Sequence, residues 1–131
     1  MADYKPRVLV DFDGVIHRYS KGWHDGTAYD VPMTGAREAI NRMRKLGYDV
    51  VIFSTRDASQ IAQWLEKYDF PMDMTITHHK LPAVAIIDDR AIHHIDWYSS
   101  LERLYDRYPI IEDKEKESLQ HYRDFNEMFN D

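Results

Sequence analysis

The chain has 131 residues and a formal net charge of −6, with 44% hydrophobic and 31% charged residues. This length and composition predict one soluble globular domain over residues 1–131 that buries a sizeable core. No apolar run is long enough to span a membrane, and the sequence contains no cysteine, so we expect a cytoplasmic protein without disulfides. The acidic balance disfavours long polyanions as partners, because the net field of the protein repels them.

The first predicted element is a buried strand that ends in two aspartates. Residues 8–15 read VLVDFDGV, so an apolar run leads to Asp11, Asp13 and then Gly14, which permits a sharp turn. Side chains alternate along a strand, which directs Asp11 and Asp13 to the same side. Two neighbouring carboxylates repel each other, and a hard divalent cation such as Mg²⁺ would neutralise them through oxygen ligands. The alternative is a strand that simply ends in an acidic turn.

A long loop is predicted next, over residues 17–31, where glycines alternate with aromatic and polar residues. Long loops in compact domains are usually functional or disordered, and the aromatic content disfavours disorder. We therefore expect a flap over the site, with Trp23 near its entrance. The alternative is a surface hairpin that packs on its own Trp23.

The remaining chain alternates between helix and strand patterns. Helices are expected from the N-cap Thr34 to Gly47, from the capping box that begins at Asp57 to Pro71, and, in two pieces, over residues 91–108. Strands are expected at 48–54, 72–77 and within 81–87. This alternation predicts an α/β fold with a mostly parallel sheet, helices on both faces, and a ligand outside the carboxyl ends of the strands. Residues 112–130 read as a charged C-terminal helix that packs on the domain surface. A homo-oligomer contact through this helix is the alternative.

Further polar residues stand at the ends of the later strands. Ser54 ends the second strand, Lys80 precedes another apolar strand, and Asp88 and Asp89 end that strand. Together with the Asp-x-Asp pair, this ordered set resembles the haloacid dehalogenase (HAD) superfamily of phosphotransferases over residues 7–96. The resemblance implies a three-layer, doubly wound, Rossmann-like fold and Mg²⁺ as the cofactor. The gaps between the motifs are too short for the usual cap domain, so the chain looks like a compact capless member.

The resemblance also implies the roles of the acidic residues. Asp11 corresponds to the nucleophile, which forms an aspartyl-phosphate, and Asp13 to the general acid and base, whose presence points to a phosphatase or phosphomutase. The implied Mg²⁺ ligands are the carboxylates of Asp11 and Asp88 and the backbone carbonyl of Asp13. Asp89 is expected outside the metal shell, where it holds a water ligand or Lys80.

The phosphate and substrate contacts follow from the same resemblance. Ser54 or Thr55 would donate a hydroxyl hydrogen bond to the phosphoryl group, and Lys80 would neutralise its charge. Ser54-Thr55-Arg56 also resembles the corresponding region of polynucleotide-kinase phosphatase domains. Arg56 could then hold a second phosphate, while Trp23 or Tyr29 stacks on a base.

The expected activity is magnesium-dependent hydrolysis of a phosphomonoester, with a phosphorylated small molecule or a nucleotide or oligonucleotide end as the substrate. A phosphatase of sugar phosphates or other small metabolites is the alternative within enzymes. The non-enzymatic alternatives are a receiver-like signalling domain and a domain that only binds a phosphorylated ligand. The order of the motifs disfavours the receiver, because an acidic pair stands at each end of the series, with Ser54 and Lys80 between.

Overall fold

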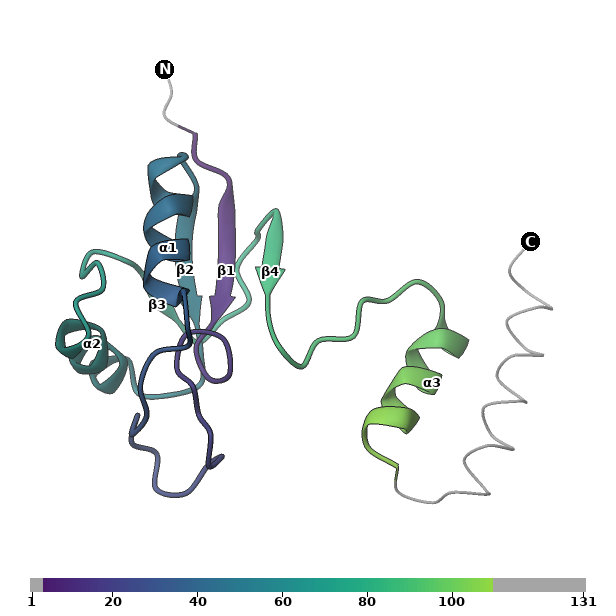
Figure 1. The fold of residues 1–131 in the computed structure, drawn as a ribbon. Helices are drawn as coiled ribbons and strands as arrows, with labels where there is room; N and C mark the ends of the chain where they lie inside the picture. Colours follow the sequence, from purple (N-terminus) through teal and green to yellow (C-terminus); the bar gives the residue numbers. More distant parts are fainter. Residues whose placement is uncertain (1–3, 110–131) are drawn as a thin grey trace. The chain divides into compact units, whose positions relative to one another are not determined.

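The structure, a computed structural model, describes residues 4–109, which divide into two compact units, one through Asp89 and one from Arg90 onward. The first unit contains β1 (Arg7–Asp11), α1 (Ala36–Lys45), β2 (Asp49–Phe53), α2 (Ala58–Lys67), β3 (Ile76–Thr77) and β4 (Ala85–Ile87), and the second contains α3 (Trp97–Arg107) (Figure 1). The α/β class is therefore confirmed. The single domain over residues 1–131 stays a prediction, and the helix expected at 112–130 lies outside the described residues.

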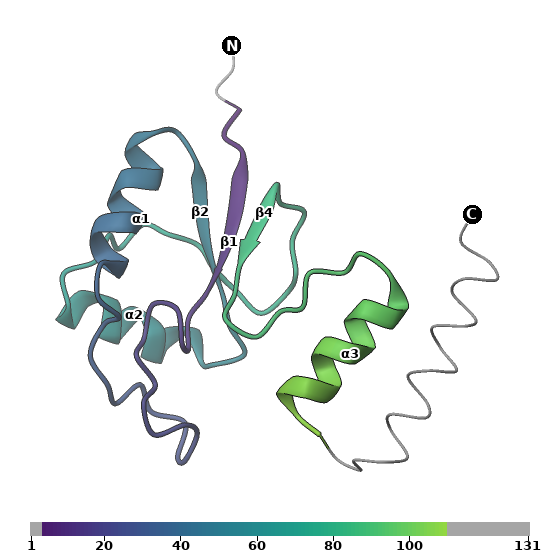
Figure 2. The ribbon, with the colours of Figure 1, turned by 45° about the vertical axis from the view of Figure 1, so that its right-hand side comes forward.

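The four described strands form one sheet in the order β3-β2-β1-β4, and every pair is parallel. Figure 2 shows β1 between β2 and β4. The register sets Asp11 opposite Phe53 and Val10 opposite Ile87. The residues that follow these strands, Ser54 and Asp88, therefore emerge at the same edge as Asp11, as the sequence predicts.

Both helices of the first unit pack against one face of the sheet. The inward side chains of β1 and β2 share a core with residues of α1 and α2: Val8, Val10, Val50 and Ile52 with Ile40, Ile61, Trp64 and Leu65. Leu9 and Val51 are also buried, and strand alternation directs them to the opposite face. The connection from β3 to β4 spans only residues 78–84 and contains no helix. The predicted three-layer arrangement therefore stays a prediction.

The edge strand β4 differs from the buried strand that its apolar sequence predicts. Ile86 and Ile87 are 41% and 42% exposed, and the preceding Val84 is 60% exposed. Parallel strands are usually joined by a helix that covers the sheet, and the helix-free connection at 78–84 supplies no such cover. Within the first unit, no helix therefore covers the apolar side chains of β4.

The helix ends agree only in part with the predicted caps. Asp57 caps α2 as expected, because its side chain accepts a hydrogen bond from the Ser59 N–H. Thr34 is not the cap of α1, which begins after Gly35 at φ +81° without a side-chain cap. α3 begins after Asp96, whose carboxylate accepts a hydrogen bond from the Ser99 N–H. Residues 91–96 are therefore not helical, contrary to the prediction of a helix over 91–108. None of the described helices combines the length and apolar character that crossing a membrane requires.

Candidate functional site

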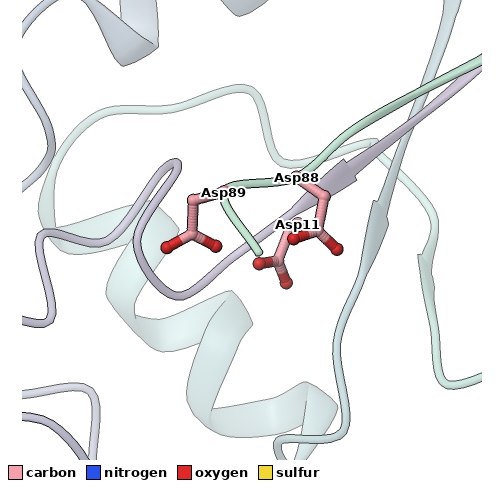
Figure 3. A group of neighbouring side chains, drawn as sticks. All are labelled: Asp11, Asp88 and Asp89. Carbon is pink, nitrogen blue, oxygen red and sulfur yellow. The ribbon is translucent and has the colours of Figure 1, made fainter. Parts of the chain in front are cut away.

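Three aspartates meet at the carboxyl edge of the sheet. Asp11 ends β1, while Asp88 and Asp89 follow β4, and one carboxylate oxygen from each residue lies within 4.8 Å of the others (Figure 3). The pairing of Val10 with Ile87 brings Asp88 beside Asp11. Asp11 and Asp88 are partly buried, and Asp89 is exposed.

This donor set fits a hard cation. Carboxylates this close repel one another, and a divalent ion with oxygen ligands removes that repulsion. The sequence predicts Asp89 only as an outer partner of the metal, whereas its carboxylate lies as close as those of Asp11 and Asp88. The backbone carbonyl of Asp13 as a further ligand stays a prediction.

Gly14 explains how Asp89 comes so near. Its φ of +83° lies in the left-handed region, and a Cβ atom at this position would collide with the Asp89 carboxylate. The sequence predicts Gly14 as a turn residue, and the structure adds that the missing side chain leaves room for a third carboxylate.

The Asp13 carboxylate instead bonds to two basic side chains. The Arg56 Nε lies 2.9 Å from each Asp13 oxygen, and the His17 Nδ1 lies 2.8 Å from Oδ1. Arg56 and His17 are buried, with 4% and 0% exposure. Sequence reasoning missed His17, because residues 13–17 form a turn, and no local periodicity pairs its side chain with Asp13.

Arg56 also contacts the loop at 17–31. Its Nη1 donates to the Gly26 carbonyl at 2.6 Å, and its guanidinium lies 5.5 Å and 5.4 Å from the ring centroids of Tyr19 and Trp23. Cation–π contacts of this kind stabilise the loop over the arginine. The sequence predicts Arg56 as a substrate contact, and the structure shows it bonded to Asp13 and covered by the loop.

Hydrogen bonds connect the two ends of the loop at 17–31. The Asp30 carboxylate accepts hydrogen bonds from the hydroxyl and N–H of Ser20 and from the Val31 N–H. The Arg18 N–H donates to the Val31 carbonyl, and the Trp64 Nε1 donates to the Asp30 carbonyl. Trp23 is 65% exposed. The movement of this loop as a flap stays a prediction.

The predicted phosphate-binding residues lie on two segments. Ser54 is buried directly after β2, and its Oγ accepts from the Arg56 N–H at 3.1 Å, whereas Thr55 is exposed. Lys80 is exposed in the connection between β3 and β4. The parallel register brings Ser54 to the edge that carries Asp11, whereas Lys80 stands on a loop whose position the strand register does not fix.

Comparison of the chain with protein-family models, with curated proteins and with solved structures finds no match. The functional conclusion therefore depends on the carboxylate cluster and on the side chains that surround it.

The Asp30 contacts generate a prediction about pH. The hydrogen bond from the Ser20 hydroxyl, followed by those from the Ser20 and Val31 N–H groups, lowers the pKa of Asp30 from 3.8 to about 2. Because the folded-state pKa is the lower one, the contribution to stability is present above pH 3.8 and is lost as the pH falls through about 2. Asp30→Asn should therefore lower the free energy of unfolding at neutral pH.

Urea unfolding of wild type and Asp30→Asn across this pH range measures the effect. The difference between them should shrink toward zero as the pH approaches about 2. Glu66→Gln, which removes an exposed carboxylate on α2, is the matched control. A difference independent of pH would contradict the role of the Asp30 charge.

Gly14 generates a second prediction. Gly14→Ala and Gly35→Ala place a side chain at nearly equal φ values of +83° and +81°, but nothing lies within 4 Å of the Gly35 Cβ position. Both variants should lose about 1–2 kcal/mol for the left-handed backbone. Gly14→Ala also displaces the exposed Asp89 carboxylate, so the two variants should differ in their response to a cation. Thermal melting with and without MgCl₂ tests this, since Gly14→Ala alone should lose cation-dependent stabilisation. Equal behaviour of the two variants would refute the proposed role of Gly14.

Proposed function

We propose that this protein is a magnesium-dependent phosphomonoester hydrolase and a capless member of the HAD superfamily. The carboxylate cluster of Asp11, Asp88 and Asp89, at the carboxyl edge of a parallel sheet, is the observation that supports this proposal most strongly. Open α/β sheets bind their ligands at this edge. The order of the motifs, from the Asp-x-Asp pair through Ser54 and Lys80 to Asp88 and Asp89, supports the same reaction.

The proposed reaction has two steps at Asp11. A carboxylate oxygen of Asp11 attacks the phosphorus, the bond to the leaving oxygen breaks, and Asp13 delivers a proton to that oxygen. Water then attacks the phosphorus of the aspartyl-phosphate while Asp13 takes a proton from it, which releases phosphate and restores Asp11. The cycle starts with Asp13 protonated, and each step conserves protons, because Asp13 loses this proton in the first step and regains one in the second.

Other side chains would bind the transferred group. The Ser54 hydroxyl, or that of Thr55, would donate to a phosphoryl oxygen, and Lys80 would add positive charge. Asp11, Asp88 and Asp89 would hold Mg²⁺, which when bound neutralises charge on the phosphoryl oxygens.

Three features support a proposal about the substrate class. In the described chain, a loop stands between β1 and α1 where the HAD superfamily often inserts a cap domain, and a site without a cap would admit a large leaving group. Trp23, at 65% exposure, could stack on a base, a contact that contributes about 1–3 kcal/mol. The net charge of −6 favours short ligands over long polyanions. We therefore propose a nucleotide or an oligonucleotide end as the substrate.

Activity on a generic aryl phosphate tests the reaction. The wild type should hydrolyse p-nitrophenyl phosphate with MgCl₂ and lose this activity with a chelator. Asp11→Asn should lower kcat by more than about 10³-fold, because it removes the nucleophile. Asp73→Asn, which removes an exposed carboxylate on the amino-terminal side of β3, is the matched control. Full turnover in a correctly folded Asp11→Asn would refute the nucleophile. Binding of beryllofluoride without any turnover by the wild type would favour a domain that only binds phosphorylated ligands.

A comparison of specificity constants tests the substrate class. The values of kcat/KM should be higher for a nucleoside monophosphate or a 3′-phosphorylated oligonucleotide than for a sugar phosphate. Trp23→Ala should reduce this preference about fivefold or more, as expected for the loss of base stacking. Trp97→Ala removes another exposed tryptophan and serves as the control. A clear lead for the sugar phosphate would indicate a metabolite phosphatase and leave the reaction class intact.

A further inference from the structure

His17 is a fully buried histidine whose ring is held in place on several sides. It stacks on Phe12, with ring centroids 5.2 Å apart and planes inclined by 16°. Trp64 and Tyr29 meet its ring edge-on at 5.6 Å and 5.3 Å. An imidazole packed in this way cannot rotate about its Cβ–Cγ bond without moving its aromatic neighbours, so the positions of its two nitrogens are fixed.

The hydrogen bonds of His17 determine which nitrogen carries the proton. The Asp30 backbone N–H lies 2.9 Å from Nε2, and an amide N–H can only donate, so Nε2 is the acceptor. The proton of the ring therefore stands on Nδ1, which donates to the Asp13 Oδ1 at 2.8 Å. Trp64 in turn holds the Asp30 carbonyl through its Nε1 at 2.8 Å. The buried tryptophan of α2 thus orients Asp13 through Asp30 and His17.

The two oxygens of Asp13 are held unequally. Oδ1 accepts from His17 and shares the Arg56 Nε–H, whereas Oδ2 receives only the other half of that shared bond. The Nη1 of Arg56 donates its hydrogen bond to the Gly26 carbonyl and not to Asp13. Oδ1 is therefore the anchored oxygen, and Oδ2 is the oxygen that can exchange a proton with a substrate or water.

We propose that His17 is a positioning residue that acts through Asp13: its Nδ1–H and the Arg56 Nε–H anchor Oδ1, so that Oδ2 faces the oxygen of the leaving group. This inference rests on the proposed function, because it assigns a purpose to the general acid. It also gives Arg56 a role in orienting Asp13, in place of a direct contact with substrate. No additional chemical step is required, since Oδ2 performs the proton transfers already described.

A pair of substitutions separates the two hydrogen bonds of His17. The amide nitrogen of Asn replaces Nδ1, so His17→Asn keeps a donor to Asp13 and loses the acceptor for the Asp30 N–H. His17→Gln reaches the position of Nε2, so it keeps an acceptor for Asp30 and loses the donor to Asp13. His17→Gln should therefore impair catalysis more than His17→Asn, whatever their relative thermal stabilities.

The leaving group provides a readout that a purely structural role would not change. Loss of general-acid function lowers turnover most for a poor leaving group. In His17→Gln, kcat for phenyl phosphate should fall about tenfold or more relative to wild type, and kcat for p-nitrophenyl phosphate should fall less, with KM nearly unchanged. Equal losses for both substrates, or equal losses in the two variants, would overturn the proposal. No turnover by the wild type would instead refute the proposed function, and this role with it.

Two further measurements do not depend on the stability of the His17 variants. Two-bond ¹⁵N–¹H NMR spectra of the wild type should show the ring proton on Nδ1, and a proton on Nε2 would contradict the hydrogen-bond arrangement. Arg56→Lys should lower kcat with KM little changed, whereas a raised KM with unchanged kcat would identify Arg56 as a substrate contact instead. Arg44→Lys, which alters the exposed pair with Asp73, is the matched control and should leave both constants unchanged.

Discussion

Mutual repulsion among three carboxylates is the constraint around which this site is organised. One oxygen each of Asp11, Asp88 and Asp89 lies within 4.8 Å of the others, at an edge where parallel strands end together. Coulomb repulsion at such distances is strong outside bulk water, and the fold must balance it by packing or by a cation. The buried strand β1, with Val8, Leu9 and Val10 at most 5% exposed, supplies the rigid support that holds Asp11 in place.

A second charged centre lies two residues further along the chain and is balanced within the protein itself. Asp13 pairs with the guanidinium of Arg56, and the same guanidinium is covered by Tyr19 and Trp23. A buried arginine needs hydrogen-bond acceptors, and here the Asp13 carboxylate accepts from Nε and the Gly26 carbonyl from Nη1. The loop at 17–31 is therefore part of the support of Asp13. Any opening of this loop would disturb the arginine that orients that carboxylate.

The connection between β3 and β4 determines how the edge strand β4 is covered. It spans residues 78–84 without a helix, carries Lys80, and leads to an edge strand with exposed isoleucines. The short connection has two consequences. It keeps Lys80 on a loop, where its side chain is exposed, and it supplies no helix within the first unit to cover the apolar side chains of β4.

The sequence by itself determined the elements and the edge at which the polar residues gather. Apolar runs followed by Asp11, Ser54 and Asp88 indicate strands that end in polar side chains, and in a parallel sheet such ends lie at the same edge. The burial of β4 was not predictable in this way, because it depends on what covers the edge strand. The cap at Asp57 and the helix end at Gly47 were also predictable, because they depend on local backbone chemistry.

Only the tertiary structure decided which partners these groups find. The contact of Asp13 with Arg56 joins residues 43 positions apart, and no local periodicity encodes it. The role of His17 depends on Asp30 and Trp64, which lie on a loop and a different helix. The approach of Asp89 depends on the absent side chain of Gly14. Local patterns predict elements because hydrogen bonding and periodicity act over a few residues, whereas the pairing of charges depends on how those elements pack.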